Sequence, residues 1–89
     1  HGVYVTCGSL PDGRMYHGVT NVGTRPTVTD GDAVSVETFL LGFDGDLYGQ
    51  EIRIEFCRRL RGEKKFASLE ELRQEIQHNI RETKRYFGE

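Results

Sequence analysis

Glu37 is the residue of this sequence best suited to acid–base chemistry. It lies in residues 34–41, where nearly all neighbours are apolar or small and the pattern is typical of a strand. A carboxylate there either points to solvent or is held in a cleft, where it can accept a proton from a reacting hydroxyl. The residues alone leave both alternatives open.

A basic segment is the second feature that could bind a ligand. Five cationic side chains occur within eight positions: Arg58, Arg59, Arg61, Lys64 and Lys65. Such a run is usually a solvated face, although a phosphate-bearing ligand also requires one. Phe66 follows directly, and an aromatic ring beside a basic loop can stack on a flat ring system. Phe66 could equally be a hydrophobic staple before a helix that starts near Ser68.

Other catalytic and metal-binding patterns are missing from the sequence. It contains no phosphate-binding loop of the Walker type, no nucleophile elbow and no His-Glu-x-x-His motif. His17 and His78 are isolated, which favours solvent-facing or hydrogen-bonded positions over metal ligation. Cys7 and Cys57 have no zinc spacing and define no disulfide framework, as is usual in a reducing compartment. We therefore predict no metal site in these residues, and a cytoplasmic protein.

The size and composition are those of one small globular domain. The chain has 89 residues, of which 36% are hydrophobic and 29% charged. No run approaches the ~18 consecutive apolar residues of a membrane span. The formal net charge of −2 argues against a nucleic-acid partner for the chain as a whole.

Most of the chain is predicted to form strands. Alternating or strand-like patterns cover residues 3–7, 14–22, 34–41 and 51–60. In the last of these, Ile52, Ile54 and Phe56 share one face. Residues 23–33 are predicted to form a long irregular loop, and Asp44-Gly45 a hairpin turn.

The last quarter of the chain is predicted to be one helix. Ser68 and Glu71 form a capping-box pattern, and Gly88 is a plausible stop. One apolar stripe recurs at helical spacing: Leu69, Leu72, Ile76, Ile80, Thr83 and Phe87. Several strands followed by an amphipathic helix indicate a small antiparallel barrel or sheet with the helix packed against it. Because the chain opens inside a strand pattern, we expect an earlier part to be missing.

Four segments in order resemble one known family, the riboflavin kinase module of bacterial bifunctional riboflavin kinase/FMN adenylyltransferases (FAD synthetases). The segments are residues 2–5, 18–27, 36–49 and 60–72, which include Gly2-Val3-Tyr4-Val5, Thr24-Arg25-Pro26-Thr27, Glu37-Thr38 and Leu60-Arg61-Gly62-Glu63-Lys64-Lys65-Phe66. Each is weak alone, but together they span nearly the whole chain.

The resemblance implies a fold and an activity. The fold would be mainly β: a small antiparallel Greek-key barrel of six strands closed by one C-terminal helix, incomplete in residues 1–89. The enzyme would transfer the γ-phosphate of ATP, with Mg²⁺, to the terminal ribityl hydroxyl of riboflavin and give FMN. In the parent protein an N-terminal adenylyltransferase domain of the same chain would convert FMN to FAD. Neither a nucleic acid nor a membrane is implied as a partner.

The resemblance also implies roles for individual residues. Glu37 matches the general base. The nucleotide pocket carries over to Leu40, Gly42 and Tyr48, and the flavin side to Arg61, Lys64 and Phe66. A flap matches residues 21–33, in which Asn21 and Arg25 are weaker candidates for ligand contacts.

This sequence departs from the family pattern in three places. Phe39 replaces the usual His after Glu-Thr, and Gly62 replaces a frequent Pro. The family's Pro-Thr-Ala-Asn motif, which binds ATP phosphates and Mg²⁺, would precede Gly2, and Pro26-Thr27-Val28 does not replace it. We therefore expect the 89 residues alone to be inactive. The alternatives are a non-catalytic small barrel that binds nucleotides or nucleic acid, and a purely structural domain.

Overall fold

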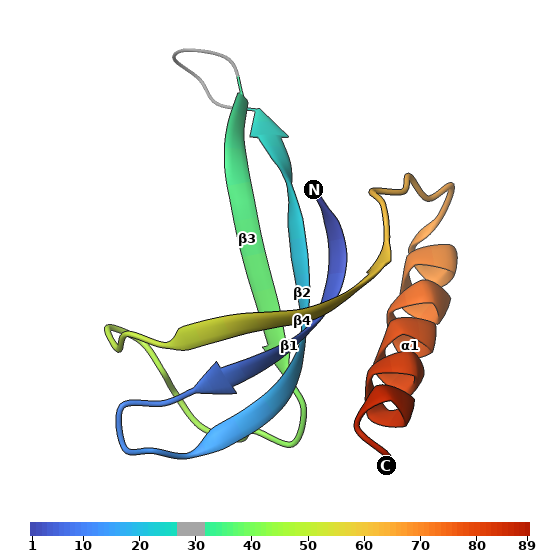
Figure 1. Ribbon diagram of the computed structural model, residues 1–89. Coiled ribbons are helices and arrows are strands. Elements are labelled where there is room, and N and C mark those ends of the chain that lie inside the picture. The colour runs from blue at the N-terminus through green and yellow to red at the C-terminus, as the bar shows by residue number, and fades with distance from the viewer. Residues whose placement is uncertain (27–31) are drawn as a thin grey trace.

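A computed structural model of the chain describes residues 1–26 and 32–89. These residues form four strands and one helix (Figure 1). The elements are β1 (Gly2–Ser9), β2 (Met15–Pro26), β3 (Asp32–Leu40), β4 (Arg53–Arg61) and α1 (Leu69–Tyr86).

The strands form one antiparallel sheet in the order β3-β2-β1-β4. Three consecutive strands are followed by a fourth that returns beside the first, which is the Greek-key arrangement. The predicted antiparallel Greek-key fold with a C-terminal helix is therefore confirmed. In the part of the chain that the structure describes, the sheet has four strands, not six, and β3 and β4 are its two edges.

The expectation of a long loop over residues 23–33 was wrong for residues 23–26 and 32–33, which belong to strands. The β2–β3 pairing continues from Gly18 opposite Leu40 to Pro26 opposite Asp32. Thr24 lies opposite Val34, and β-branched residues favour strands. Pro26 is tolerated because it ends its strand. Of the predicted loop and flap, residues 27–31 lie outside the described residues.

The expectation of a hairpin at Asp44-Gly45 was also wrong. Strand β3 pairs with β2, and β4 pairs with β1, so β3 and β4 do not pair with each other. The Asp-Gly pair instead lies in a connection that carries the chain from one edge of the sheet to the other. A Greek key requires such a long connection, whereas a local Asp-Gly signal cannot report which strands will pair.

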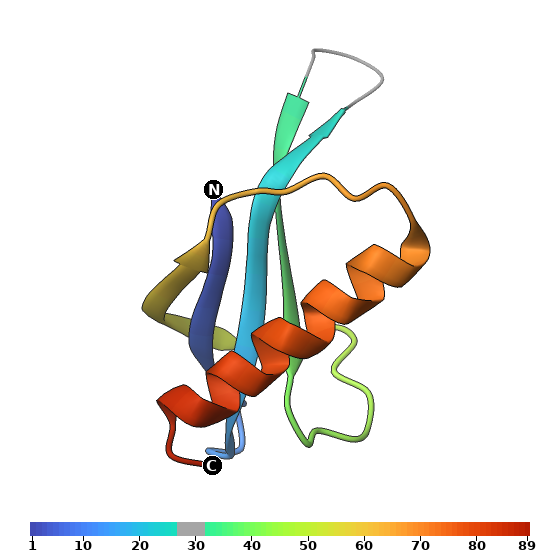
Figure 2. The ribbon, with the colours of Figure 1, turned by 90° about the vertical axis from the view of Figure 1, so that its right-hand side faces the viewer.

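One face of the sheet is covered by α1, which crosses it diagonally (Figure 2). Val3 and Val5 are buried on this face of β1. The helix meets the sheet chiefly at β2. Within α1 the apolar stripe is unevenly covered: Thr83 is fully buried, whereas Leu69 is 78% exposed. The N-terminal half of the helix therefore leaves apolar surface open beside the sheet.

The other face of the sheet curls over a small interior. The predicted shared face of β4 is confirmed, because Ile52 and Ile54 approach Gly8 on β1 and the Phe56 ring meets Tyr4 edge-on at 5.1 Å. A Cβ on Gly8 would lie 2.7 Å from the Leu40 side chain, so a larger residue at that position would require Leu40 to shift.

A chain of three threonine hydroxyls crosses this interior. The Thr20 Oγ1 lies 2.9 Å from the Thr6 Oγ1 and 2.8 Å from the Thr38 Oγ1. Thr6 and Thr20 are completely buried. Buried hydroxyls are costly unless they are hydrogen-bonded. The row of threonine hydroxyls therefore links β1, β2 and β3 inside the fold.

We expect Thr20→Val to lower the free energy of unfolding by about 1–3 kcal/mol, because it leaves the buried Thr6 hydroxyl without its partner. Urea unfolding would measure the change. Thr24→Val is the matched control on the same strand, where the residue is exposed, and it should change stability by less than about 0.5 kcal/mol. Equal effects of the two substitutions would contradict the role of the hydroxyl chain.

The helix ends are those that the sequence predicts. The Ser68 hydroxyl accepts a hydrogen bond from the Glu71 backbone N–H at 3.2 Å. The Glu71 carboxylate accepts one from the Ala67 N–H at 2.9 Å, one residue earlier than a strict capping box would have it. Gly88 takes a positive φ of 79° just after the helix, as a glycine stop requires.

Candidate active site

A groove of about 490 Å³ lies between α1, the loop after β4, and the faces of β2 and β3. Its size falls within the range of small-molecule sites, roughly 300–1,000 Å³. Its walls combine apolar side chains with a few polar groups. The lining residues are Val3, Val19, Asn21, Glu37, Thr38, Phe39, Arg61, Glu63, Lys64, Phe66, Leu72, Ile76, Asn79 and Ile80.

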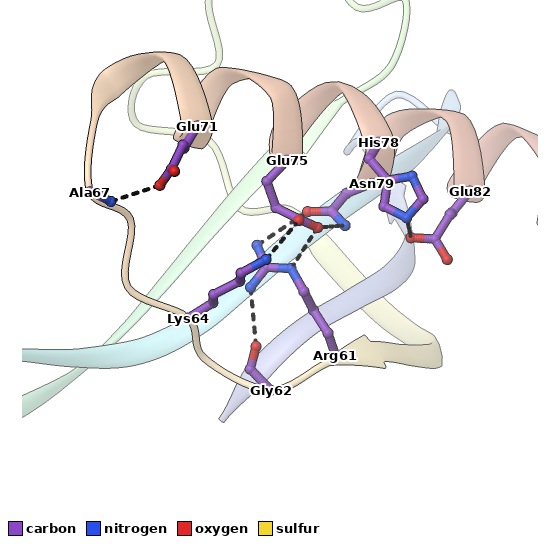
Figure 3. Close-up of polar contacts among 9 residues, drawn as sticks. All are labelled: Arg61, Gly62, Lys64, Ala67, Glu71, Glu75, His78, Asn79 and Glu82. Atoms are coloured by element: carbon purple, nitrogen blue, oxygen red, sulfur yellow. Dashed lines mark hydrogen bonds and ion pairs between the residues drawn. The ribbon is translucent and has the colours of Figure 1, made fainter.

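An ion-pair network joins the loop after β4 to the helix at one wall of the groove (Figure 3). The Arg61 Nε lies 3.2 Å and the Lys64 Nζ 3.4 Å from the Glu75 carboxylate. Arg61 also donates from Nη2 to the Asn79 Oδ1 at 3.2 Å, and Asn79 donates to Glu75 at 3.1 Å. The Arg61 Nε contact is an ion pair without hydrogen-bond geometry. The network holds Arg61, at the end of β4, and Lys64, in the following loop, against α1.

Glu75 is the anion at the centre of this network, and its side chain is largely buried. Burial by itself raises the pKa of a carboxyl, but the hydrogen bond from Lys64, the charge of Arg61, and the further contacts with Asn79 and Lys64 outweigh it. The pKa of Glu75 is therefore lowered below its ordinary value of 4.5. Ionised Glu75 thus stabilises the folded chain.

We expect this stabilisation to depend on pH. A carboxyl whose pKa is lower in the folded chain contributes stability above its unfolded pKa and loses it as the pH falls through the folded pKa. The Glu75→Gln variant should therefore be less stable than the parent above pH 4.5, and the difference should shrink in more acidic solution. Urea unfolding at a series of pH values measures this. A difference that stays constant down to the acid limit would refute the ionic role of Glu75.

Phe66 presents its ring to the same two cations. The Arg61 guanidinium lies 5.8 Å and the Lys64 ammonium 5.6 Å from the ring centroid. Both distances are within the range of cation–π contacts. Phe66 is half-buried and lines the groove together with Leu72 at the start of the helix. Its position is compatible with both predicted roles, a ring wall and a staple before the helix.

Glu37 lies on β3 on the opposite side of the groove, with Asn21 as its cross-strand partner on β2. It is exposed and accepts a hydrogen bond from the Ser35 hydroxyl at 3.2 Å. The carboxylate is therefore reached by solvent and also lines the groove, and its role as a base stays a prediction.

Other residues singled out in the sequence lie elsewhere. Leu40, Gly42 and Tyr48 do not line the groove. The Leu40 side chain packs toward Gly8 and Gly18 in the interior, and Tyr48 is 94% exposed. The backbone of Arg25 pairs with Ala33, and its side chain lies outside what the structure describes. The roles of these four residues stay predictions.

Asn79 of the groove wall, and Glu75 behind the groove cations, were not singled out from the sequence. They lie one helical turn apart beside the stripe positions Ile76 and Ile80. A carboxylate and an amide spaced i, i+4 can interact on a helix, and that was the available signal. Leu72 and Ile76 fit the stripe but are partly exposed in the groove wall.

The histidines have the solvent-facing or satisfied positions that the sequence favours. The His17 Nδ1 lies 2.7 Å from the Glu89 carboxylate, and its ring stacks on Phe87 at 3.5 Å. His78 lies 3.0 Å from Glu82. Among residues 1–26 and 32–89, no three His, Cys, Asp or Glu side chains come together as a metal site. The described residues therefore form no carboxylate cluster that would hold a magnesium ion.

The fold and groove together define a small Greek-key module that can hold a ligand between its sheet and its helix. The chain belongs to the riboflavin kinase family, because the family model described as "Flavokinase: Riboflavin kinase" matches residues 1–87. This membership does not favour a non-catalytic nucleotide- or nucleic-acid-binding module.

The chain is similar to curated proteins named bifunctional riboflavin kinase/FMN adenylyltransferase. It is 36% identical to the protein of Haemophilus influenzae over 98% of this chain and 28% of that protein. It is likewise 36% identical to the protein of Bacillus subtilis over 98% of this chain and 28% of that protein. The chain therefore spans under a third of the length of the relatives it matches.

A solved structure has the same fold. The crystal structure titled as a macrolide-efflux protein from Streptococcus pneumoniae matches with a TM-score of 0.84 and 26% identity, over 93% of this chain and 27% of that one. In the described part of our chain, no helix is long and apolar enough to cross a membrane.

Proposed function

We propose that this chain is part of a riboflavin kinase that transfers the γ-phosphate of ATP to the terminal ribityl hydroxyl of riboflavin, with FMN as the product. The observation that carries the proposal is the groove. It brings the proposed base Glu37 onto the same surface as Arg61, Lys64 and Phe66, which lie more than twenty positions later in the sequence. Family membership supports the same activity.

The groove suits a flat, mainly apolar ring system. Phe66, Leu72 and Ile76 supply apolar surface from the loop and the helix. Arg61 and Lys64 are already held by Glu75, so their orientation costs little when a ligand arrives. We place the isoalloxazine ring against Phe66, with the ribityl chain directed toward Glu37 on the opposite wall.

Glu37 would act as the general base. As the terminal ribityl oxygen attacks the γ-phosphorus, its proton passes to the Glu37 carboxylate, the new oxygen–phosphorus bond forms, and the bond to the β-phosphate oxygen breaks to release ADP. Solvent access to Glu37 would let the carboxyl release that proton afterwards. Asn21, its neighbour across the β2–β3 pair, lies close enough to be a further ligand contact.

The ATP-binding part of the active site would be completed by residues outside this chain. Leu40, Gly42 and Tyr48 are proposed for the nucleotide pocket, while the ATP phosphates and Mg²⁺ would be bound by residues of a longer parent protein. Its N-terminal adenylyltransferase domain would convert FMN to FAD, and we propose that it works in the cytoplasm. Phosphoryl transfer depends on positioning and charge stabilisation at the phosphates, so the 89 residues alone should not turn over.

Riboflavin fluorescence quenching tests the proposal. We would compare this chain with a version extended upstream to the length of its relatives, each with and without magnesium-ADP. Quenching by the extended protein, with FMN formation once ATP is added, would support the kinase. If neither protein quenches riboflavin, the proposed function is wrong. FMN formation by the 89 residues alone would instead refute the proposed upstream phosphate site.

A further inference from the structure

Two thiols that are fifty positions apart in the sequence lie side by side in the fold. The Cys7 Sγ on β1 and the Cys57 Sγ on β4 are 3.9 Å apart, and both cysteines are free. We propose that this pair is a peroxide-sensitive dithiol that closes to an intramolecular disulfide between β1 and β4. The proposal does not depend on the kinase activity.

The pairing of the two strands explains why the thiols meet. Cys7 lies opposite Glu55, two positions from Cys57, so both cysteines belong to the same face of the β1–β4 pair. The register then shifts: Thr6 pairs with Phe56, but Val5 pairs with Arg58. Cys57 is the extra residue of this β-bulge, and bulges characteristically redirect side chains. The cysteine pair therefore depends on tertiary pairing, which sequence spacing cannot reveal.

The two thiols differ in accessibility. Cys57 is exposed, and its sulfur also lies 3.8 Å from the Glu55 carbonyl oxygen. Cys7 is half-buried, and its pKa is raised, first by burial and then by the neighbouring Cys57 and Glu55. An oxidant in solution thus reaches Cys57 first, and Cys7 is placed to resolve the oxidised sulfur.

The chemistry balances with a hydroperoxide as the oxidant. The Cys57 sulfur attacks one peroxide oxygen, the oxygen–oxygen bond breaks, and a sulfenic acid forms with loss of water or an alcohol. The Cys7 sulfur then attacks the Cys57 sulfur, the sulfur–oxygen bond breaks, and the hydroxyl leaves as water with the Cys7 thiol proton. The net reaction oxidises two thiols to one disulfide and reduces one peroxide.

Only a small movement is needed for closure. A disulfide bond is about 2.05 Å long, so the sulfurs must approach by roughly 2 Å, and Cys57 is exposed. The bond would fasten edge strand β4 to the centre of the sheet. Because β4 ends at Arg61 in the groove wall, oxidation would also stabilise the strand that carries this residue of the candidate site.

Stoichiometric hydrogen peroxide on the reduced chain tests the proposal. We expect a monomer that has lost two hydrogens in mass, a peptide linking Cys7 to Cys57, and a melting temperature higher by on the order of 10 °C, all reversed by a thiol reductant. The Cys7→Ser variant should stop at a sulfenic acid on Cys57 that a dione reagent traps. The Cys57→Ser variant should react more slowly than the parent.

Other outcomes would overturn the proposal. One is a product linked only between chains, or one in which both cysteines gain oxygen without losing two hydrogens. Another is cross-linking that is as fast in concentrated urea as in the folded chain, because proximity in the fold would then have no part. Since each serine variant loses only one thiol, a mass readout on either one remains informative even if its stability changes.

Discussion

Glu37→Gln should lower kcat for FMN formation by about 10²–10⁴-fold in the full-length parent protein, while the affinity for riboflavin changes little. The amide is nearly the same size as the carboxylate and keeps the surface of the groove, but it cannot accept the proton of the ribityl hydroxyl. A selective loss of kcat is expected when a group acts only in the transition state. Steady-state kinetics with riboflavin and ATP, together with flavin quenching, would separate the two parameters.

The matched control for Glu37 is Glu55→Gln. Glu55 is also an exposed carboxylate on a strand, but it lies on β4 and does not line the groove. Its substitution should leave kcat within about twofold. If the two variants lost activity equally, overall charge would explain the effect. If Glu37→Gln lost less than tenfold, another group would have to take the proton.

Local patterns in the sequence were sufficient for much of the fold. The helix from Leu69 to Tyr86 could be predicted from Ser68, Glu71 and Gly88 because caps and stops act within a single turn. The inner face of β4 could be predicted from alternation, because every second side chain of a strand shares a face.

What the sequence could not predict depends on pairing between distant segments. Asp44-Gly45 favours a turn, but whether that turn closes a hairpin depends on competition among all the strands. Here β3 pairs with β2 and β4 pairs with β1, so no hairpin forms. The approach of Cys57 to Cys7 has the same origin. For residues 23–26, cross-strand partners on β3 outweighed the local signals of a loop.

The candidate site likewise contains residues that the sequence could predict and residues that it could not. Glu37 and Phe66 stood out because their chemistry is unusual in their own segments. Glu75 did not, because a glutamate on a helix is ordinary until Arg61 at the end of β4 and Lys64 in the next loop approach it. Positioning groups of this kind are visible only once the tertiary structure is known.

Phe66→Ala should weaken riboflavin binding by about 5–150-fold, which corresponds to the roughly 1–3 kcal/mol that stacking on an aromatic side chain contributes in nucleobase binding. The substitution removes the only aromatic ring that Arg61 and Lys64 both face among the described residues. Phe66→Tyr should keep most of the affinity because it keeps the ring. Fluorescence quenching would measure affinity, and thermal unfolding would be recorded on the same samples.

The second readout separates the two roles of Phe66. If the ring were only a staple before α1, Phe66→Ala would lower the melting temperature and leave the affinity of the folded protein unchanged. Phe43→Ala is the matched control, because Phe43 is also half-buried and meets Tyr16 edge-on at 5.3 Å, but it does not line the groove. It should cost stability without affecting riboflavin affinity. A loss of affinity confined to Phe66→Ala would mean that the ring binds the flavin directly, with Arg61 and Lys64 holding it in place.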